Sequence, residues 1–149
     1  MHKNGPVGKN IGLRNVYDAL VCSLGMDTEQ YMAGSGRLTT HVLDTMHGTP
    51  ARGMRLELLY VHGDHTHHIM DSYTNADGRV DQPLLEGDQF QLGEFEIHFH
   101  VGQYFERVGV EIDKAFLDVV PIRFTIAEDR HYHVPLLVSP FAYSTYRGS

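Results

Sequence analysis

Histidine and arginine residues in separate stretches of the chain are of the types that hydrolysis at neutral pH needs. His41 lies in an alternating stretch that begins at Leu38, Arg79 follows an Asp-Gly corner, and His133 ends a His-Tyr-His triplet. Histidine suits a general base because its ordinary pKa is about 6.5. A fixed arginine can stabilise an oxyanion and can bind a planar ring edge through two hydrogen bonds. These residue types favour attack of an activated water on a carbonyl carbon.

The chain ends on the polar tetrapeptide Tyr146–Ser149, directly after an alternating stretch. The last residues of most domains are loosely held, so a polar ending at this place suggests that the terminus is used. The carboxylate of Ser149 could orient an imidazole, as a buried aspartate does in a hydrolase triad. Tyr146 and Ser149 therefore join the candidate site, and either His41 or His133 could be the base.

The remaining histidines raise the alternative of a metal site, because the chain has eleven of them. Four lie in the stretch His62–His68, and His98 and His100 share one face of a predicted strand, where His131 and His133 could join them. The favoured interpretation is a solvated hairpin tip for the first group and a solvent-facing row for the second. A short flexible tip lacks the outer hydrogen bonds that orient metal ligands. We therefore expect no metal and no cofactor in the candidate site.

The elements that must position these side chains are mostly strands. From Leu38 onward the apolar residues alternate with polar ones, and Gly, Pro and Asp-Gly turns separate the stretches. Pro121 indicates an edge or a bulge in the strand that contains it. The pattern predicts an all-β sandwich of seven to eight strands with one short helix. The expected strands are 38–44, 52–61, 67–74, 90–101, 116–126, 131–138 and 141–147, and the helix is 103–110.

Residues 1–36 differ from the rest and are predicted to be an N-terminal extension to a domain at 37–149. Apolar residues between Leu13 and Leu24 recur at helical spacing, which predicts a short amphipathic helix on a flexible arm. Arg14 and Asp18 interrupt the only stretch that could serve a signal peptide. The cytoplasm is therefore the expected compartment, with the periplasm or the peroxisome as the alternative if the extension is a targeting segment.

Composition excludes several classes of protein. The formal charge is −7 and the isoelectric point about 5.8, which disfavours a broad basic face and so argues against nucleic-acid and anionic-membrane partners. The apolar runs are far shorter than the roughly 20 residues that span a bilayer. Cys22 is the only cysteine, so an internal disulfide is impossible.

The motifs around these candidate residues resemble those of the transthyretin-like 5-hydroxyisourate hydrolases. The matching stretches are Leu-Thr-Thr-His-Val-Leu-Asp at 38–44, Asp-Gly-Arg at 77–79, His-Tyr-His-Val-Pro at 131–135 and the terminal Tyr-Arg-Gly-Ser. The resemblance covers about residues 38–149. It implies a prealbumin (transthyretin-like) sandwich and a homotetramer with active sites at a dimer–dimer interface.

The resemblance also implies what each residue does. His41, Arg79, His133 and Ser149 would be catalytic, and His41, Arg79 and Tyr146 would bind the substrate. The reaction would be the cofactor-free hydrolysis of 5-hydroxyisourate to 2-oxo-4-hydroxy-4-carboxy-5-ureidoimidazoline in urate degradation. Two alternatives stay open: a transthyretin-like carrier of a small ligand such as a hormone, and a zinc enzyme that uses the histidine-rich segments.

Overall fold

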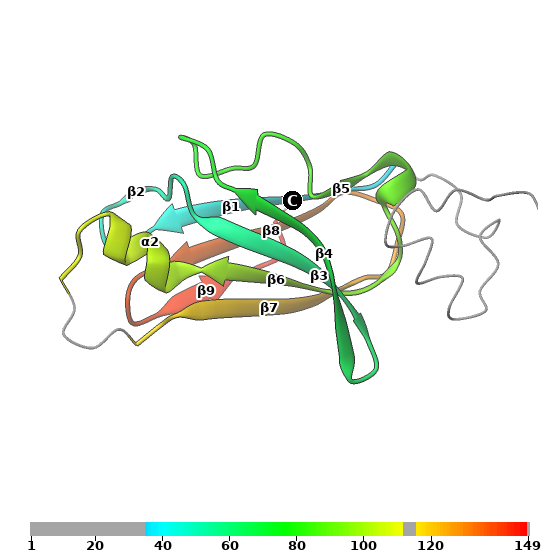
Figure 1. Ribbon diagram of the computed structural model, residues 1–149. Coiled ribbons are helices and arrows are strands. Elements are labelled where there is room, and N and C mark those ends of the chain that lie inside the picture. The colour runs from blue at the N-terminus through cyan, green and yellow to red at the C-terminus, as the bar shows by residue number, and fades with distance from the viewer. Residues whose placement is uncertain (1–34, 112–115, 149) are drawn as a thin grey trace, which may run out of the picture. The chain divides into compact units, whose positions relative to one another are not determined.

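Two β-sheets packed face to face organise the described residues, which are 35–111 and 116–148 of the computed structural model (Figure 1). These residues belong to one compact unit, Met32–Ser149. The extension predicted at 1–36 lies almost wholly outside the described residues. No helix in the described part is long and apolar enough to cross a membrane.

The first sheet contains the strands that carry the candidate residues. Its order is β2-β1-β8-β9, with β5 also paired to β1. The second sheet has the order β4-β3-β6-β7. The bounds are β1 Arg37–Asp44, β2 Thr49–Pro50, β3 Arg55–His62, β4 His65–Tyr73, β5 Leu85–Glu86, the 3-10 turn η2 Gly87–Gln89, β6 Gly93–His100, α2 Val101–Arg107, β7 Val119–Ile126, β8 Tyr132–Val138 and β9 Tyr143–Thr145.

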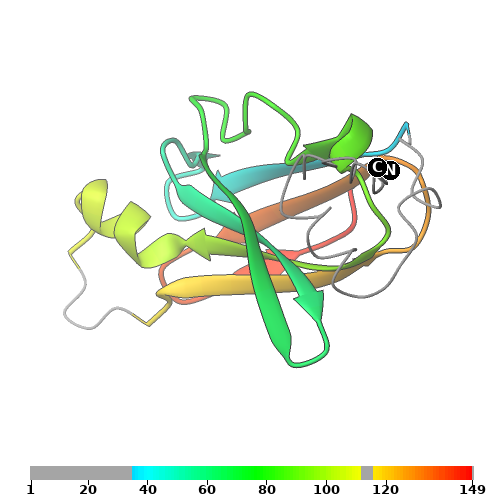
Figure 2. The same ribbon diagram turned by 45° about the vertical axis from the view of Figure 1, so that its right-hand side comes forward.

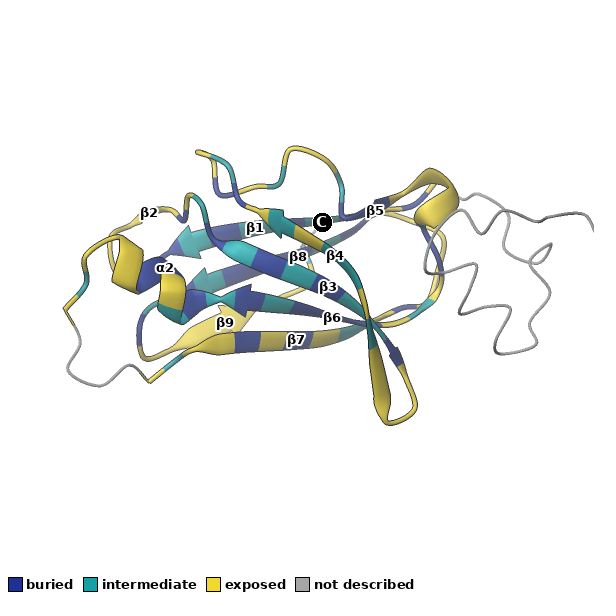
Figure 3. Cartoon of the chain, in the orientation of Figure 1, coloured by how far each residue is buried: buried dark blue, intermediate teal, exposed yellow. Residues whose placement is uncertain are grey.

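The alternation of the sequence produces the core. In β1 every second residue is buried, because successive side chains of a strand point to opposite faces. The same period is visible along the strands in Figure 3, where buried and less buried positions alternate. The largest fully buried side chains come from both sheets and from residues directly before their strands: Phe95, Phe99, Leu38, Met54, Leu56, Leu58, Leu84, Leu85, Ile97, Ile126, Leu136 and Val42.

The predicted sandwich is confirmed, with shifted ends and two additions. The seven expected strands are present, and the two-residue strands β2 and β5 add to them. Two residues are too few to show an alternating pattern, so β2 and β5 were not predicted. Pro121 lies in β7, which is an edge strand of its sheet, as the proline indicated. The pairing of β3 with β4 shifts register between Leu58 and Leu59, where Ile69 of β4 is passed over, and the alternation expected for β3 breaks there because Leu59 and Tyr60 are both half-buried.

The helix is tied to the end of β1 through a buried carboxylate. Asp44 accepts a hydrogen bond of 2.8 Å from the hydroxyl of Tyr104 in α2 and lies 2.6 Å from Nδ1 of His47. Burial raises the pKa of Asp44, but hydrogen bonds from His47 and Tyr104 outweigh it and leave that pKa below its usual value. Burial, and after it the contact with Asp44, raises the pKa of Tyr104. Both groups therefore keep their ordinary charge at neutral pH, and α2 is fixed against β1.

Candidate active site

Neighbouring strands β1 and β8 carry the candidate residues on one outer face of the first sheet. The two strands run parallel, with Thr39 beside His133 and His41 beside Pro135. Thr39, His41 and His133 are half-buried, whereas Leu38, Thr40 and Val42 are buried in the sandwich. The period of two therefore aims both predicted histidines away from the core and to the same side.

A tight turn brings Arg79 to β1. Oδ1 of Asn75 accepts hydrogen bonds from the backbone N–H groups of Asp77 and Arg79, at 2.9 and 3.1 Å. The backbone N–H of Val42 donates to the carbonyl of Gly78 at 2.8 Å, and Arg79 pairs with His41 in an antiparallel bridge. Gly78 has a φ of +73°, and a Cβ there would collide with the carbonyl oxygen of Val42, so only glycine suits this corner.

The C-terminal segment returns to His133. The backbone N–H of Gly148 donates to the carbonyl of His133 at 2.8 Å, and the two residues form a bridge. Tyr146 is 60% exposed in the described part of the single chain. The predicted role of Ser149 concerns a residue that lies outside the described part of the chain.

A threonine hydroxyl joins two histidines in this site. Oγ1 of Thr39 lies 2.8 Å from Nδ1 of His133 and 2.8 Å from Nε2 of His131. One hydroxyl has a single proton to donate, so with neutral rings it donates to one and accepts an N–H from the other. The tautomers of the two histidines are therefore coupled. The sequence pattern drew attention to His131 only as a possible metal ligand and missed Thr39, although Thr39 and His41 share the i, i+2 spacing.

These side chains surround a shallow hollow of about 290 Å³, which is lined by Thr39, Thr40, Arg79, Val80, His131 and His133. Burial lowers the pKa of His133, and the positive charge of Arg79 and the neighbouring His131 and His41 lower it further. His133 is therefore neutral at neutral pH and has a ring nitrogen free to accept a proton. The arrangement has what base-assisted hydrolysis needs: a neutral imidazole, a cation and a space for a small ring.

The predicted cluster of His41, Arg79 and His133 is thus brought together within one chain. The alternative metal site that joined His98 and His100 to His131 and His133 is wrong, because these histidines, which lie on strands of different sheets, do not form a ligand group within the described residues. His98 lies 2.7 Å from Glu96, and His100 lies 2.8 Å from Glu57. Within residues 35–111 and 116–148, no three of the histidines in His62–His68 converge on one point.

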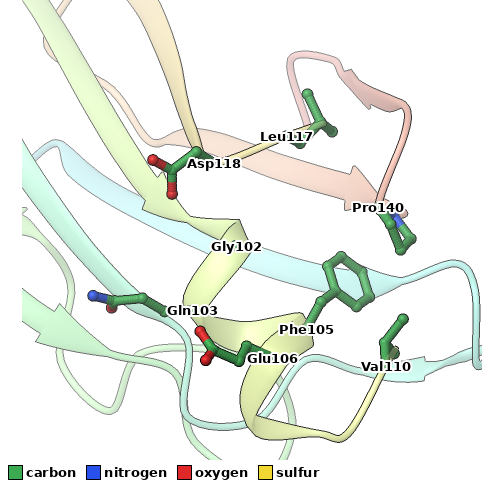
Figure 4. Close-up of a pocket in the computed structure, with 8 residues that line it drawn as sticks. All are labelled: Gly102, Gln103, Phe105, Glu106, Val110, Leu117, Asp118 and Pro140. Carbon is green, nitrogen blue, oxygen red and sulfur yellow. The ribbon is translucent and has the colours of Figure 1, made fainter. Parts of the chain in front are cut away.

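A second hollow lies beside α2 and has a different character. It measures about 340 Å³, and its lining residues are Gly102, Gln103, Phe105, Glu106, Val110, Leu117, Asp118 and Pro140. Figure 4 shows the ring of Phe105 near Pro140 and Val110, with the two carboxylates on the other side. This hollow contains no histidine and no cation among its lining residues, so it lacks the groups for the predicted chemistry.

Comparisons with known proteins agree with the fold and with the motifs. Residues 38–148 match the HIUase/Transthyretin family. The chain is 58% identical over 120 residues to 5-hydroxyisourate hydrolase 2 of Rhizobium meliloti (strain 1021), covering 79% of this chain and 100% of that protein. The solved structure of Klebsiella pneumoniae 5-hydroxyisourate hydrolase has a TM-score of 0.62 and 33% identity, covering 80% of this chain and 97% of the other.

A crystal structure of (S)-allantoin synthase is also similar. Its TM-score is 0.74 at 42% identity, and the match covers 89% of this chain. The match covers 49% of that protein, so the present chain corresponds to about half of it.

Proposed function

The chain belongs to the HIUase/Transthyretin family and is an enzyme of its hydrolase kind, and from that premise we propose that it hydrolyses 5-hydroxyisourate in urate degradation. The observation that carries the proposal is the meeting of Arg79 and His133 at one hollow on the face of β1 and β8, with His41 paired to Arg79 beside it. The product would be 2-oxo-4-hydroxy-4-carboxy-5-ureidoimidazoline.

His133 is the general base in this proposal. Its lowered pKa keeps the ring neutral, and Thr39 occupies Nδ1. Nε2 is therefore the nitrogen left to take a proton from water, provided that the ring carries its own proton on Nδ1 and donates it to Thr39. The hydroxyl of Thr39 then donates to His131, which completes a consistent set of tautomers.

Arg79 stabilises the negative charge that develops on the attacked carbonyl oxygen. Water adds to the amide carbon as its proton passes to His133, which gives a tetrahedral oxyanion. Collapse of this intermediate breaks the ring C–N bond, and the proton on His133 passes to the departing nitrogen. His41, which pairs with Arg79 across the bridge, binds the substrate beside it. No metal and no cofactor is required by these steps.

The active form is a homotetramer with the sites at a dimer–dimer interface. Support comes from surfaces that a single chain leaves open: β9 is the last strand of its sheet and all its residues are exposed, and β7 is the edge of the other sheet. Phe141 is 61% exposed and Tyr146 60% exposed. Unpaired strand edges and apolar patches of this kind are typical of protein interfaces. Assembly would close the shallow hollow and bring Tyr146 and Ser149 to the substrate.

A carrier of an apolar hormone is disfavoured by the hollow itself. Its walls present Arg79, His131 and His133 together with two threonines. Burying an arginine and two imidazoles against an apolar ligand would leave them without partners, which costs free energy.

The test is the decay of enzymatically generated 5-hydroxyisourate, followed by its absorbance. With the full-length protein the decay should be much faster than the spontaneous rate, and exhaustive chelation should not slow it. Decay at the spontaneous rate would contradict the proposal, and activity lost on chelation and restored by zinc would favour the zinc-enzyme alternative.

The pH dependence of kcat/KM should report the state of His133. A base must be neutral to act, so kcat/KM is expected to rise as pH increases through the pKa of His133 and to stay level above it. Because burial and Arg79 lower this pKa, the rise should lie below about pH 6.5, the ordinary value for histidine. Rates measured from acid to neutral pH, corrected for spontaneous decay at each pH, give the midpoint. A midpoint at or above the ordinary value would exclude His133 from the role of base.

Replacing Thr39 by valine is expected to lower kcat about tenfold with a smaller change in KM. Valine keeps the shape of threonine but cannot accept the N–H of His133, so the reactive tautomer is no longer favoured. Well-placed acid–base catalysis increases the rate about 10²- to 10⁴-fold. Loss of control over the tautomer removes part of this rate enhancement. Serine at this position retains the hydroxyl and should restore most of the rate.

Nitrogen NMR of the imidazoles separates this positioning role from a structural one. In the wild type, the ring of His133 should carry its proton on Nδ1, and in Thr39→Val the other tautomer should gain population. An unchanged tautomer with an unchanged rate in Thr39→Val would show that the threonine does not position the base.

A further inference from the structure

A group of polar side chains with metal-ligand chemistry lies on the outer face of the second sheet, away from the candidate active site. Glu57 comes from β3, and His68 and Asp71 come from the adjacent strand β4. One ligand atom from each of the three side chains lies within 4.8 Å of the others. Figures 1 and 2 show β3 and β4 side by side in both views. The three groups are therefore held by paired strands rather than by a loose loop.

Arg55 already places a positive charge between the two carboxylates of this group. Its Nη2 atom lies 3.1 Å from Oε1 of Glu57 and 3.6 Å from Oδ1 of Asp71. The same oxygen of Asp71 lies 2.9 Å from Nε2 of His68. The hydrogen bond from His68 and the charge of Arg55 keep the pKa of Asp71 below its usual value. The position between these oxygens thus attracts a cation, and the protein's own guanidinium occupies it.

A further histidine orients Glu57 from behind. Nε2 of His100 in β6 lies 2.8 Å from Oε2 of Glu57, and the His100 side chain is only 13% exposed. This hydrogen bond engages one carboxylate oxygen and leaves Oε1 for the contact with Arg55. A partner of this kind, which fixes the orientation of a ligand, commonly strengthens metal binding by about 10- to 100-fold.

We propose that Glu57, His68 and Asp71 form a binding site for a divalent transition-metal ion such as Zn²⁺, which displaces the guanidinium of Arg55. One imidazole and two carboxylates form a ligand set that zinc accepts, with water in the fourth position. Zn²⁺ carries twice the charge of the guanidinium it replaces and bonds directly to the oxygens. The site lies on a different sheet from His41 and His133, so a metal ion bound there would take no part in the hydrolysis.

Neighbouring substitutions should have opposite effects on zinc affinity. Glu57→Gln removes a charged ligand and should weaken binding at this site by at least about tenfold, since loss of a residue that only orients a ligand already costs about 10- to 100-fold. Arg55→Gln removes the internal competitor and should tighten binding by about threefold to tenfold, since the cost of displacing a paired charge disappears. A histidine-rich patch that captured zinc without this geometry would show neither pattern.

Calorimetric titration of the full-length protein with ZnCl₂ at neutral pH measures both effects. The wild type and Arg55→Gln should bind one equivalent that Glu57→Gln and Asp71→Asn bind at least about tenfold more weakly. His65→Gln, in the same hairpin but outside the group, should keep that equivalent, and so should His133→Gln. Circular dichroism spectra and unfolding temperatures confirm that each variant is folded.

The proposal is overturned if Glu57→Gln retains the equivalent at wild-type affinity or if His65→Gln loses it. It is also overturned if Arg55→Gln binds zinc no more tightly than the wild type. The visible absorption spectrum of the Co²⁺ complex gives a second readout. The wild type should show the spectrum of Co²⁺ bound by one imidazole and two carboxylates, and this spectrum should change in His68→Gln.

Discussion

Replacing Arg79 by glutamine is expected to lower kcat/KM about 10²- to 10³-fold, the usual cost of removing a group that stabilises a developing oxyanion. Glutamine retains a hydrogen-bond donor but no charge, so the loss should appear mainly in kcat. The structure places Arg79 at the wall of the hollow that His133 also lines. The rate of 5-hydroxyisourate decay under saturating substrate measures the effect.

A second consequence of the same substitution concerns His133. The charge of Arg79 is one cause of the lowered pKa of that histidine, after burial. In Arg79→Gln the rise of kcat/KM with pH should therefore move to higher pH, though not by the whole shift, because burial persists. A smaller kcat together with an unmoved pH midpoint would mean that the two residues do not face each other in the working enzyme.

The matched control is Arg55→Gln, which makes the same chemical change on the other sheet. Arg55 pairs with Glu57 and Asp71 on the partly exposed surface, where ion pairs contribute little to stability. Arg55→Gln should therefore leave the rate of hydrolysis unchanged. If Arg79→Gln stays within about threefold of the wild-type rate, far less than the usual cost of losing such a group, the role assigned to Arg79 is wrong.

The sequence predicted which faces the residues occupy but not which residues meet. Alternation along β1 predicts that His41 points to the same side as Thr39, because the side-chain period of a strand is two. The parallel pairing that sets Thr39 beside His133 depends on register between strands more than ninety residues apart, and nothing local encodes it. The hydroxyl shared by His131 and His133 therefore appears only in the folded chain.

The same reason explains the histidines of the second sheet. Their spacing predicted a common outward face for His98 and His100, which the half-buried positions of both support. The partner of His100 could not be predicted, because Glu57 belongs to another strand, whereas Glu96, the partner of His98, lies two residues away in β6 itself. The histidine-rich stretch from His62 to His68 looked like a single cluster in sequence, yet an antiparallel hairpin spreads it along a strand, and only His68 joins a group of ligands in the described residues.

Replacing Gly148 by alanine is expected to lower kcat/KM about tenfold to a hundredfold while leaving the unfolding temperature nearly unchanged. A Cβ at this position would come closer than 3.0 Å to Cδ2 of His133, a separation that real Cβ contacts do not show. The φ of Gly148 is not positive, so alanine brings no backbone strain. The collision alone must be relieved, by rotation of the His133 ring or by withdrawal of the terminal segment.

Either movement damages the base. Thr39 holds the imidazole at Nδ1, so Nε2 is the ring nitrogen left for the proposed proton transfer, and the backbone of Gly148 lies near Cδ2, the ring carbon next to it. A displacement of about 1 Å at a reacting group can cost about 10²-fold in rate. The hydrogen bond from the Gly148 N–H to the His133 carbonyl could survive ring rotation, which is why stability should change little.

Gly63→Ala is the contrasting variant, since its effects should be the reverse. Gly63 has a φ of +57° with open space around its Cβ position, at the tip of the β3–β4 hairpin and on the other sheet. Alanine there costs about 1 kcal/mol of backbone strain and should lower the unfolding temperature while the rate stays at the wild-type value. Wild-type activity in Gly148→Ala would mean that the terminal segment does not restrain His133, and the account of how Nε2 becomes the reactive nitrogen would have to be abandoned.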